Sequence, residues 1–453
     1  MLKIFGTDGI RCKVNQEPMS PDTCLKIAKV AGYILSKKTN KKNRVVISKD
    51  TRLSGYLFEP LITSGFLSVG MDVVLVGPLP TPALPMLIKS LRADMGVMIT
   101  ASHNTYEYNG LKFFDSKGDK ISKSLEKKIE EIIYDQKKYS FISTLKKESG
   151  KAFRLEDARG RYLEYLKSKL DEKIELKKLK IVLDCANGAT YNVAPILFWE
   201  LGYDLITIND RPNGRNINKK CGAVDIRELS KKVIEVKADI GFAFDGDGDR
   251  ILAINEKGGE IDGDKIIALF AKNYLQNKKL NKKTVVTTVM SNLGLENYLR
   301  EDLGIKLIRT KVGDINVISE MKKNSYILGG EQSGHIILGN YIKTGDGILA
   351  ALKIAEILSS TGLKSSKLFD LYKSIPQTKI NLAIKNELNN RLNNKINRII
   401  KKYNTNSKNL RILIRKSGTE PLIRILVEGK ISENVANISK TLDKEIKKIL
   451  NDK

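Results

Sequence analysis

The feature that most constrains this chain is a repeated alternation of short apolar runs with stretches of helical periodicity. Met95 to Ile99 and Ile240 to Phe244 are two such runs, and each has the length and composition of a buried strand. Between such runs, segments such as Cys24 to Lys37 place apolar residues three or four positions apart, which is the period of a helix. Leu2 to Phe5 also predicts a short strand, which a tight loop from Gly6 to Arg11 would follow. Strands that alternate with helices predict βαβ units and doubly wound α/β sheets.

Three polar loops are the candidate functional segments. Ser102 and His103 follow the first apolar run, and a loop that contains Asp245, Asp247 and Asp249 follows the second. A third loop, Gly-Gly-Glu-Gln-Ser-Gly-His, ends at His335. Open α/β sheets bind ligands at the carboxyl ends of their strands, so these loops are expected to meet at one site. The chain has only 2 histidines, and both lie in these loops.

The length of 453 residues predicts three or four domains. A polar, charged stretch around Lys137 to Lys151 marks the first boundary, and the pattern changes again near Ser374. There, Leu410 to Ile414 and Ile423 to Val427 predict two strands joined by a short loop, in an α+β unit. The expected units are three α/β domains at 1–151, 152–256 and 257–371 and an α+β domain at 372–453.

The composition indicates the cellular location and the state of the cysteines. No run of 18 apolar residues occurs, and the first residues lack the apolar core of a secretory signal, so the expectation is a cytoplasmic protein without membrane spans. The cysteines form no C-x-x-C pair, which favours reduced thiols over a disulfide or zinc framework. They are Cys12, Cys24, Cys185 and Cys221.

The net charge of +27 raises the alternative of a protein that binds nucleic acid or another polyanion. However, the excess lysine is spread over surface-like helices such as Asn389 to Lys402, and no segment is a polybasic tail. A general compositional bias toward lysine therefore explains the net charge better than nucleic-acid binding does. The basic last segment remains suited to a small anionic ligand.

The aspartate loop predicts a metal site. Carboxylates at alternate positions, separated by glycines, let the backbone fold around one hard cation, and oxygen-only ligands favour Mg²⁺ over zinc or copper. An EF-hand calcium loop begins similarly, but Arg250 stands where that loop needs a glycine. A solvated acidic turn is the structural alternative, because glycine-spaced aspartates also form ordinary turns.

A serine beside a Mg²⁺ site indicates phosphoryl transfer through a phosphoserine, with the metal neutralising charge on the transferring group. Serine hydrolysis is the competing reading, since His103 adjoins Ser102, but the chain has no G-x-S-x-G elbow. It also has no G-x-x-x-x-G-K-[ST] segment, which argues against Walker-type nucleotide binding.

Taken together, four ordered motifs resemble the signatures of the α-D-phosphohexomutases. They are T-A-S-H-N with N-G-L-K-F-F, D-G-D-G-D-R, G-E-Q-S-G-H and R-K-S-G-T-E-P. The segments L-D-C-A-N-G-A and N-I-N-K-K-C-G-A, with the glutamine of the third motif, are most similar to the amino-sugar branch of that family. The resemblance implies a four-domain, heart-shaped isomerase with its active site in a central cleft.

The resemblance also implies the reaction and the partners. The enzyme would interconvert glucosamine 6-phosphate and glucosamine 1-phosphate through a phosphoserine and a bisphosphorylated sugar, serving amino-sugar nucleotide and cell-wall precursor synthesis. A phosphoglucomutase or phosphomannomutase of the same fold is the alternative. The partner is then a small hexosamine phosphate, with neither nucleic acid nor membrane involved, and the sequence does not decide between a monomer and a homodimer.

Specific residues inherit roles from this resemblance. Ser102 would carry the phosphoryl group and would hold Mg²⁺ together with Asp245, Asp247 and Asp249. Lys112, His335 and Arg11 would be the acid, base and positioning groups. Glu331 and Ser333 would bind sugar hydroxyls, and Arg415, Ser417, Gly418, Thr419 and Arg424 would grip the phosphate that is not transferring. Cys12, Thr105 and Ile315 depart from the family pattern, which puts the rigidity of their loops in question.

Overall fold

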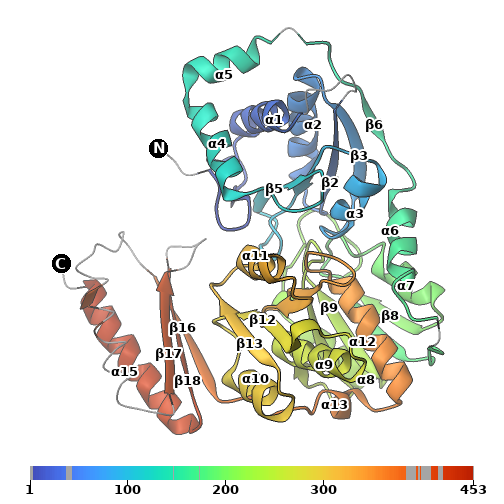
Figure 1. The fold of residues 1–453 in the computed structure, drawn as a ribbon, viewed down its shortest axis with the longest axis vertical. Helices are drawn as coiled ribbons and strands as arrows, with labels where there is room; N and C mark the ends of the chain where they lie inside the picture. Colours follow the sequence, from blue (N-terminus) through green and yellow to red (C-terminus); the bar gives the residue numbers. More distant parts are fainter. Residues whose placement is uncertain are drawn as a thin grey trace.

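The computed structural model describes residues 4–36, 43–145, 147–172, 174–383, 394–395, 398, 410–416 and 422–451, with the backbone alone at 415, 416 and 451. Across these residues the strands form four sheets, which follow one another along the chain (Figure 1). We call the sheets and their helices units I to IV. The expected architecture, three α/β units followed by an α+β unit, is confirmed.

Unit I is a mixed sheet covered by helices on both faces. Its strands run in the order β1-β5-β4-β2-β3-β6, and β2 and β4 are parallel while β5 is antiparallel to β4. Alternate residues of β2 pack on opposite faces, because Val45 and Ile47 belong to the core cluster that includes residues of α1 and α2, whereas Val46 belongs to the cluster that includes residues of α3. The elements are β1 (Ile10–Lys13), α1 (Pro21–Leu35), β2 (Arg44–Lys49), α2 (Gly55–Ser68), β3 (Asp72–Pro78), α3 (Ala83–Ser90), β4 (Met95–Ile99), β5 (Tyr108–Asp115), α4 (Lys123–Tyr134), α5 (Gln136–Ser143) and β6 (Ala152–Arg154).

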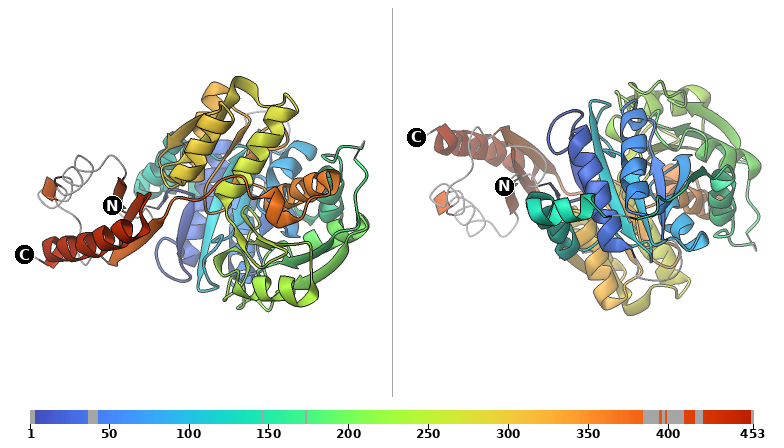
Figure 2. Two further views of the ribbon diagram at one scale, coloured as in Figure 1. Left: turned by 90° about the horizontal axis from the view of Figure 1, so that it is seen from below. Right: turned by 90° about the horizontal axis from the view of Figure 1, so that it is seen from above.

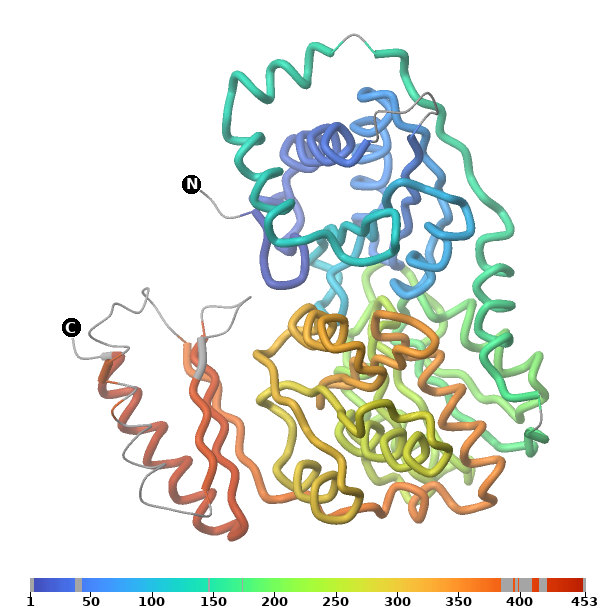
Figure 3. The backbone as a smooth tube through the Cα atoms, viewed as in Figure 1, coloured from blue at the N-terminus to red at the C-terminus, as the bar shows by residue number. Residues whose placement is uncertain are grey.

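The sheet of unit II lies below unit I, and α6 leads to it along one side of the molecule (Figure 1). The tube in Figure 3 shows the same descending path of the chain. The strand order is β11-β10-β9-β7-β8, with β7, β8 and β9 parallel and β10 turning back antiparallel to β9. The elements are α6 (Ala158–Lys167), β7 (Lys180–Asp184), α7 (Ala194–Glu200), β8 (Asp204–Ile208), α8 (Arg227–Val236), β9 (Ile240–Phe244), β10 (Ile251–Asn255) and β11 (Glu260–Ile261).

Unit III repeats the α/β design, and unit IV does not. The third sheet has the order β13-β12-β14-β15, and the fourth is an antiparallel sheet of order β16-β18-β17 with α15 packed on one face. The elements are α9 (Gly263–Gln276), β12 (Thr284–Thr288), α10 (Leu293–Asn297), β13 (Lys306–Thr310), α11 (Asp314–Asn324), β14 (Leu328–Gly330), β15 (Ile336–Leu338), α12 (Gly347–Thr361), α13 (Ser365–Leu368), β16 (Gln377–Ala383), β17 (Leu410–Lys416), β18 (Leu422–Gly429) and α15 (Ser432–Asn451).

Units I to III share buried side chains, whereas unit IV has a core of its own. One apolar cluster contains Val46 of unit I, Leu183 of unit II and Ile267 of unit III. The cluster of unit IV includes Val427 and Leu442, and its described members include no residue of the other units. Unit IV accordingly stands to one side of the others in every view (Figures 1 and 2).

The first strand is the main departure from the sequence-based expectation. Leu2 to Phe5 was expected to be a strand, but Ile4 and Phe5 are not in one, and their backbone N–H groups donate to Glu130 Oε1 instead. The strand begins at Ile10, within the expected loop, because the chain there pairs antiparallel with β5. Gly9, at φ 72°, allows that approach, since a Cβ there would lie 2.3 Å from the Leu111 carbonyl oxygen.

Two short strands lie just beyond expected unit boundaries. β6 follows position 151 yet pairs with β3 of unit I, and β11 follows position 256 yet pairs with β10 of unit II. The helix expected at Asn389 to Lys402 falls largely outside the described residues. In the part of the chain that the structure describes, no helix is long and apolar enough to cross a bilayer.

Candidate active site

Ser102 lies on the loop that leaves the buried end of β4, as expected. All five residues of β4 are buried, and Ser102 itself is 1% exposed with a left-handed φ of 49°. Its hydroxyl donates to Asp245 Oδ2 at 2.8 Å, and its backbone N–H donates to Thr100 Oγ1 at 2.9 Å. The serine of unit I therefore meets the aspartate loop of unit II directly.

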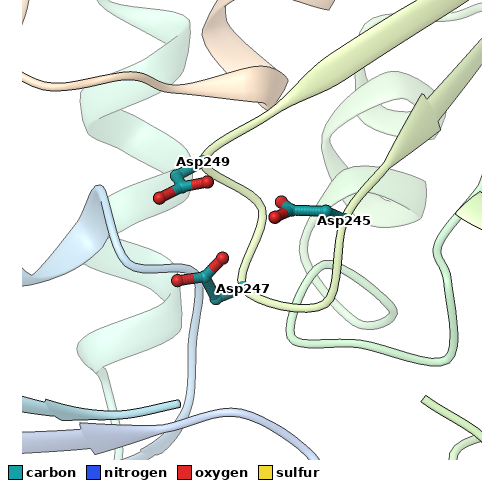
Figure 4. Close-up of side chains that lie close together, drawn as sticks. All are labelled: Asp245, Asp247 and Asp249. Carbon is teal, nitrogen blue, oxygen red and sulfur yellow. The ribbon is translucent and has the colours of Figure 1, made fainter. Parts of the chain in front are cut away.

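The three aspartates of that loop converge on one point (Figure 4). They follow the fully buried β9, are at most 3% exposed, and place one oxygen each within 4.8 Å of one another. The glycines between them are required, because a Cβ on Gly246 would lie 2.7 Å from the Ser102 carbonyl oxygen and Gly248 has φ 70°. Asp245, Asp247 and Asp249 can thus act as one ligand set.

This donor set fits Mg²⁺. All its ligand atoms are carboxylate oxygens with the Ser102 hydroxyl beside them, and hard oxygen ligands are those that Mg²⁺ prefers. Asp247 Oδ1 is buried and accepts no hydrogen bond from the described residues. Burial and the two neighbouring aspartates raise the pKa of Asp245 well above its usual value, so these carboxylates repel one another unless a cation lies between them.

The structure also argues against an EF-hand at this loop. Glu256 is twelve positions into the loop if Asp245 is counted first, where an EF-hand supplies a bidentate glutamate. Here its carboxylate faces away, toward unit III, where Ser365 Oγ donates to Oε2 at 2.9 Å and the Ser366 N–H donates to the same oxygen at 2.7 Å. The calcium alternative therefore lacks its last ligand.

Lys112 is brought to the same carboxylates from β5. Its ammonium is 2.8 Å from Asp247 Oδ2, 3.1 Å from Asp249 Oδ2 and 3.3 Å from Asp8 Oδ2, and the residue is 2% exposed. Burial alone would lower the pKa of Lys112, but these carboxylates more than offset it and hold the pKa well above its usual range. Lys112 is thus a charged group at the floor of the site.

His335 faces the aspartate loop from unit III. Its Nε2 accepts the Gly345 N–H at 3.1 Å, and its Nδ1 lies 3.7 Å from Asp249 Oδ1. Burial alone would lower its pKa, but Asp249 and neighbouring carboxylates reverse this and raise the pKa above the usual value. A neutral ring with a raised pKa accepts a proton readily, which suits a general base.

These groups border one large cleft, of about 2110 Å³, lined by all four units. Ser102 and Lys112 are not among its lining residues, but Ser102 bonds to Asp245 and Lys112 bonds to Asp249, and both of these aspartates line the cleft. The predicted site residues that line it are Arg11, Asp245, Asp249, Glu331, Ser333, His335 and Arg424. The structure thus brings together residues that are more than 400 positions apart in the sequence.

Arg11 and the expected sugar-binding residues also have defined places. Arg11 Nη1 donates to Asn104 Oδ1 at 3.1 Å, so its guanidinium sits over the serine loop. Glu331 and Ser333 lie on the turn between β14 and β15, where Glu331 Oε1 accepts the Gly313 N–H at 3.1 Å and Ser333 is exposed. Both residues face the cleft.

The expected phosphate grip is only partly described. Ser417, Gly418 and Thr419 lie outside the described residues. Arg415 is in β17, where its backbone pairs in register with Arg424 of β18. Arg424 lines the cleft from unit IV.

Sequence reasoning missed several charged residues at this site. Arg250 directly follows the aspartates and lines the cleft, and its position within the D-G-D-G-D-R motif was the available signal. Its charge, together with burial, lowers the pKa of His103 to about 2, so His103 stays neutral. Lys120 contacts both Asp8 and Asp314, and no local pattern could have indicated a bridge between units I and III.

The three residues that depart from the family pattern have ordinary structural surroundings. The Thr105 carbonyl accepts a hydrogen bond from Arg52, and the Cys12 thiol donates to the Glu17 carbonyl at 3.2 Å. Ile315 lies in α11, beside a small recess that Lys112 and Lys120 also line.

Models of known protein families match this chain along nearly its whole length. Four models described as phosphoglucomutase/phosphomannomutase domains match in order: α/β/α domain I at residues 2–140, domain II at 160–259, domain III at 262–375 and the C-terminal domain at 379–445. The chain belongs to the phosphoglucomutase/phosphomannomutase family. The family predicted from the motifs is therefore confirmed, and with it the expected enzyme class, an isomerase of the mutase type.

Individual relatives agree with this family. A phosphoglucosamine mutase from Thermodesulfovibrio yellowstonii is 46% identical over 445 residues, which is 98% of each chain. A solved phosphoglucomutase/phosphomannomutase family protein from Burkholderia thailandensis superposes with a TM-score of 0.81 at 24% identity, covering 99% of this chain and 98% of that one. A structure of Aspergillus fumigatus N-acetylphosphoglucosamine mutase in complex with GlcNAc-6P and magnesium has a TM-score of 0.63 at 17% identity, over 99% and 96%.

Proposed function

We propose that this phosphohexomutase interconverts glucosamine 6-phosphate and glucosamine 1-phosphate through a phosphorylated Ser102. The observation that carries the proposal is the buried Ser102 hydroxyl, 2.8 Å from Asp245 within a three-carboxylate set at the base of the shared cleft. The 46% identity to a phosphoglucosamine mutase supports the choice of sugar. A cytoplasmic location is part of the proposal, since its substrates are phosphorylated sugars of intermediary metabolism.

The proposed reaction has two transfers that mirror each other. In the first, the bond between phosphorus and Ser102 Oγ breaks while phosphorus bonds to the free sugar hydroxyl, whose proton passes to a base. The sugar then holds two phosphates and turns over in the cleft. In the second transfer the bond between its other phosphorus and the sugar oxygen breaks while that phosphorus bonds to Ser102 Oγ, and the sugar oxygen takes back the proton. Each cycle therefore restores the phosphoserine and moves no net phosphate to water.

The side chains at the site have properties that suit these transfers. His335, with its raised pKa, is placed to accept the proton of the sugar hydroxyl. Lys112 stays charged and can stabilise negative charge on the serine oxygen as it leaves. Arg11 sits over the serine loop and can position the reacting phosphate.

We assign Mg²⁺ to Asp245, Asp247 and Asp249 together with the oxygen of Ser102 or its phosphate. When bound, the ion would neutralise negative charge on the transferring group. The chemistry of the donor set supports this assignment, as does the orientation of Glu256, whose carboxylate is bonded to Ser365 and Ser366 and not turned toward the aspartates.

The proposal gives each unit one task, with the boundaries expected near 151, 256 and 371. Unit I supplies the phosphoserine, unit II the metal ligands, and unit III the sugar-binding residues Glu331 and Ser333. Unit IV supplies the grip on the distal phosphate, through Arg415, Ser417, Gly418, Thr419 and Arg424.

Replacing Arg424 by alanine is expected to raise the Michaelis constant by about one to two orders of magnitude. A charge-assisted hydrogen bond contributes roughly 1.5–3 kcal/mol, and about 1.4 kcal/mol corresponds to a tenfold change in affinity. Arg415→Ala is expected to act similarly, while kcat changes less in both. Steady-state kinetics on glucosamine 1-phosphate measure this, with the exposed Arg300→Ala as a control. Unchanged Michaelis constants in both variants would place the phosphate grip elsewhere.

Substrate preference tests the choice of sugar. A hydroxyl and an amine at carbon 2 differ little in size, and a neutral hydrogen bond contributes only about 0.5–1.5 kcal/mol, so discrimination is expected to be incomplete. We expect glucosamine phosphate to be the best substrate and glucose phosphate to be used more slowly. Comparing kcat/KM on glucosamine, glucose and mannose phosphates decides the matter. A preference of about tenfold or more for glucose or mannose phosphate would favour the phosphoglucomutase or phosphomannomutase alternative.

A further inference from the structure

The backbone carbonyls of the serine loop receive an unusual set of hydrogen bonds. The carbonyl of Ser102 accepts from Arg52 Nη2 at 2.9 Å and from Asn218 Nδ2 at 2.8 Å. The carbonyl of Asn104 accepts from the same two donors, at 2.8 and 2.9 Å. Each carbonyl thus has one partner from unit I and one from unit II.

Both donors are themselves held rigidly. Arg52 and Asn218 are each 2% exposed. Arg52 Nε donates to Asp50 Oδ2 at 2.8 Å, and the Asn218 N–H donates to the Ala186 carbonyl at 2.9 Å. A guanidinium offers its donors in a fixed planar fork, so a partner that fixes Nε also fixes the direction of Nη2.

The same network reaches the other side of Ser102. Thr100 Oγ1 donates to Asp50 Oδ2 at 2.6 Å and accepts the Ser102 N–H at 2.9 Å. Asp50 therefore orients both the donor to the Ser102 carbonyl and the acceptor of the Ser102 N–H. Together these contacts hold Ser102 at φ 49°, a conformation that residues other than glycine seldom adopt.

Asn218 has a chemically unambiguous orientation. Both of its partners are carbonyl oxygens, which only accept, so its NH₂ group must face them. It belongs to the N-I-N-K-K-C-G-A segment, to which the family motifs assign no chemistry. Another hydrogen bond also joins units I and II, since Thr51 Oγ1 donates to the Asn187 carbonyl at 2.5 Å.

We infer that Arg52 and Asn218 are positioning residues, which clamp the backbone of Ser102 from two units and so aim its oxygen at the aspartate loop and the cleft. The inference rests on the proposed function, in which Ser102 carries the phosphoryl group. Neither residue lines the cleft, so neither is expected to touch the substrate. Their effect should appear in the rate of phosphoryl transfer and not in substrate affinity.

Substitutions at Asn218 test the clamp in a graded way. Asn218→Ala removes one donor from each carbonyl, and Asn218→Asp replaces the donor by an oxygen that repels both carbonyls. We expect kcat to fall by about tenfold in the first and about 100-fold in the second, because a small misplacement of a reacting group can cost about that much. The Michaelis constant is expected to stay within about threefold of the wild-type value.

The matched control is Asn216→Asp, the same change two residues away. The Asn216 side-chain amide donates to the Arg211 carbonyl at 3.0 Å, within its own loop. Among the hydrogen bonds of the described residues, none joins Asn216 to the serine loop. Wild-type kinetics are expected there. Arg52→Lys is a second variant, which keeps the charge but loses the fork, and we expect it to behave like Asn218→Ala.

Two further measurements separate this inference from the proposed function. Hydrogen exchange of the peptide from Thr100 to Tyr108 reports the order of the loop whether or not the enzyme transfers phosphate, and faster exchange in both Asn218 variants is expected. Single-turnover transfer from phosphorylated enzyme to glucosamine 1-phosphate reports the chemical step, and it is expected to slow in the same order.

Unchanged loop exchange, or a raised Michaelis constant with kcat preserved, would overturn the clamp. If the wild-type protein transferred no phosphate, the proposed function would fail, and the exchange data alone would then decide whether the clamp exists.

Discussion

Ser102→Ala is expected to abolish turnover and to leave the fold intact. Removal of a nucleophile typically costs roughly 10⁴-fold or more in kcat. Among the described residues, the Ser102 hydroxyl donates only to Asp245, at 2.8 Å, and the substitution removes this hydrogen bond, at a cost to stability of about 1–3 kcal/mol. The contacts of Arg52 and Asn218 are made to the backbone and remain, so the loop should keep its shape.

Mutase assays measure turnover, thermal unfolding measures the stability of the fold, and intact-mass analysis measures the phosphate content. The native protein should carry one phosphate, located at Ser102 by peptide mapping, and the variant should carry none. Ser168→Ala is the control, because its hydroxyl donates to the Tyr165 carbonyl at 2.8 Å on the surface. An active Ser102→Ala enzyme would end the phosphoserine mechanism.

The parts of this site that sequence could predict are those that lie next to one another in the chain. Ser102 and Asp245 each follow a fully buried strand, and the spacing of the aspartates alone indicated a metal site. Short-range patterns report what the local backbone will do, and a loop at the end of a buried strand is such a pattern. The strand Ile240–Phe244 was predicted at its observed bounds for the same reason.

The contacts that could not be predicted depend on how the units pack. Asn218 is 116 residues from Ser102, and Lys120 is 194 residues from Asp314, so no period or motif connects them. Ile10–Lys13 was missed because four residues without clear alternation give no strand signal, and only its pairing with β5 makes it a strand. β16 was missed similarly, since its seven residues are mostly half-buried or exposed.

Two of the segments that carry the family resemblance also have structural contacts of their own. L-D-C-A-N-G-A and N-I-N-K-K-C-G-A were informative only through resemblance to the amino-sugar branch. In the structure the second segment contacts the serine loop through Asn218, and Asp184 Oδ2 of the first segment accepts the Gly222 N–H of the second at 2.8 Å. The clamp that we infer for Asn218 gives a physical reason for that residue type which does not depend on the sugar that is bound.

Asp247→Asn is expected to weaken Mg²⁺ binding and turnover together. The change keeps the size of the side chain and removes one charge from the three-carboxylate set, and it also weakens the contact with Lys112 at 2.8 Å. Even partners outside the ligand shell of a metal cost about 10- to 100-fold when they are lost, so we expect turnover to fall by about 100-fold or more. Magnesium binding, measured by calorimetry on the phosphorylated protein, should weaken in parallel.

The same change at Asp204 provides the control, because that carboxylate lies on the surface of unit II, 3.5 Å from Lys180. Asp204→Asn should bind Mg²⁺ and turn over as the wild type does. A chelator should stop the native enzyme, and added Mg²⁺ should restore it, whereas Ca²⁺ should restore it poorly because the larger ion needs more oxygen ligands than this loop offers. Equal activity with both ions would show that the site does not select the smaller cation, and an Asp247→Asn enzyme with unchanged Mg²⁺ affinity would move the metal away from the aspartate loop.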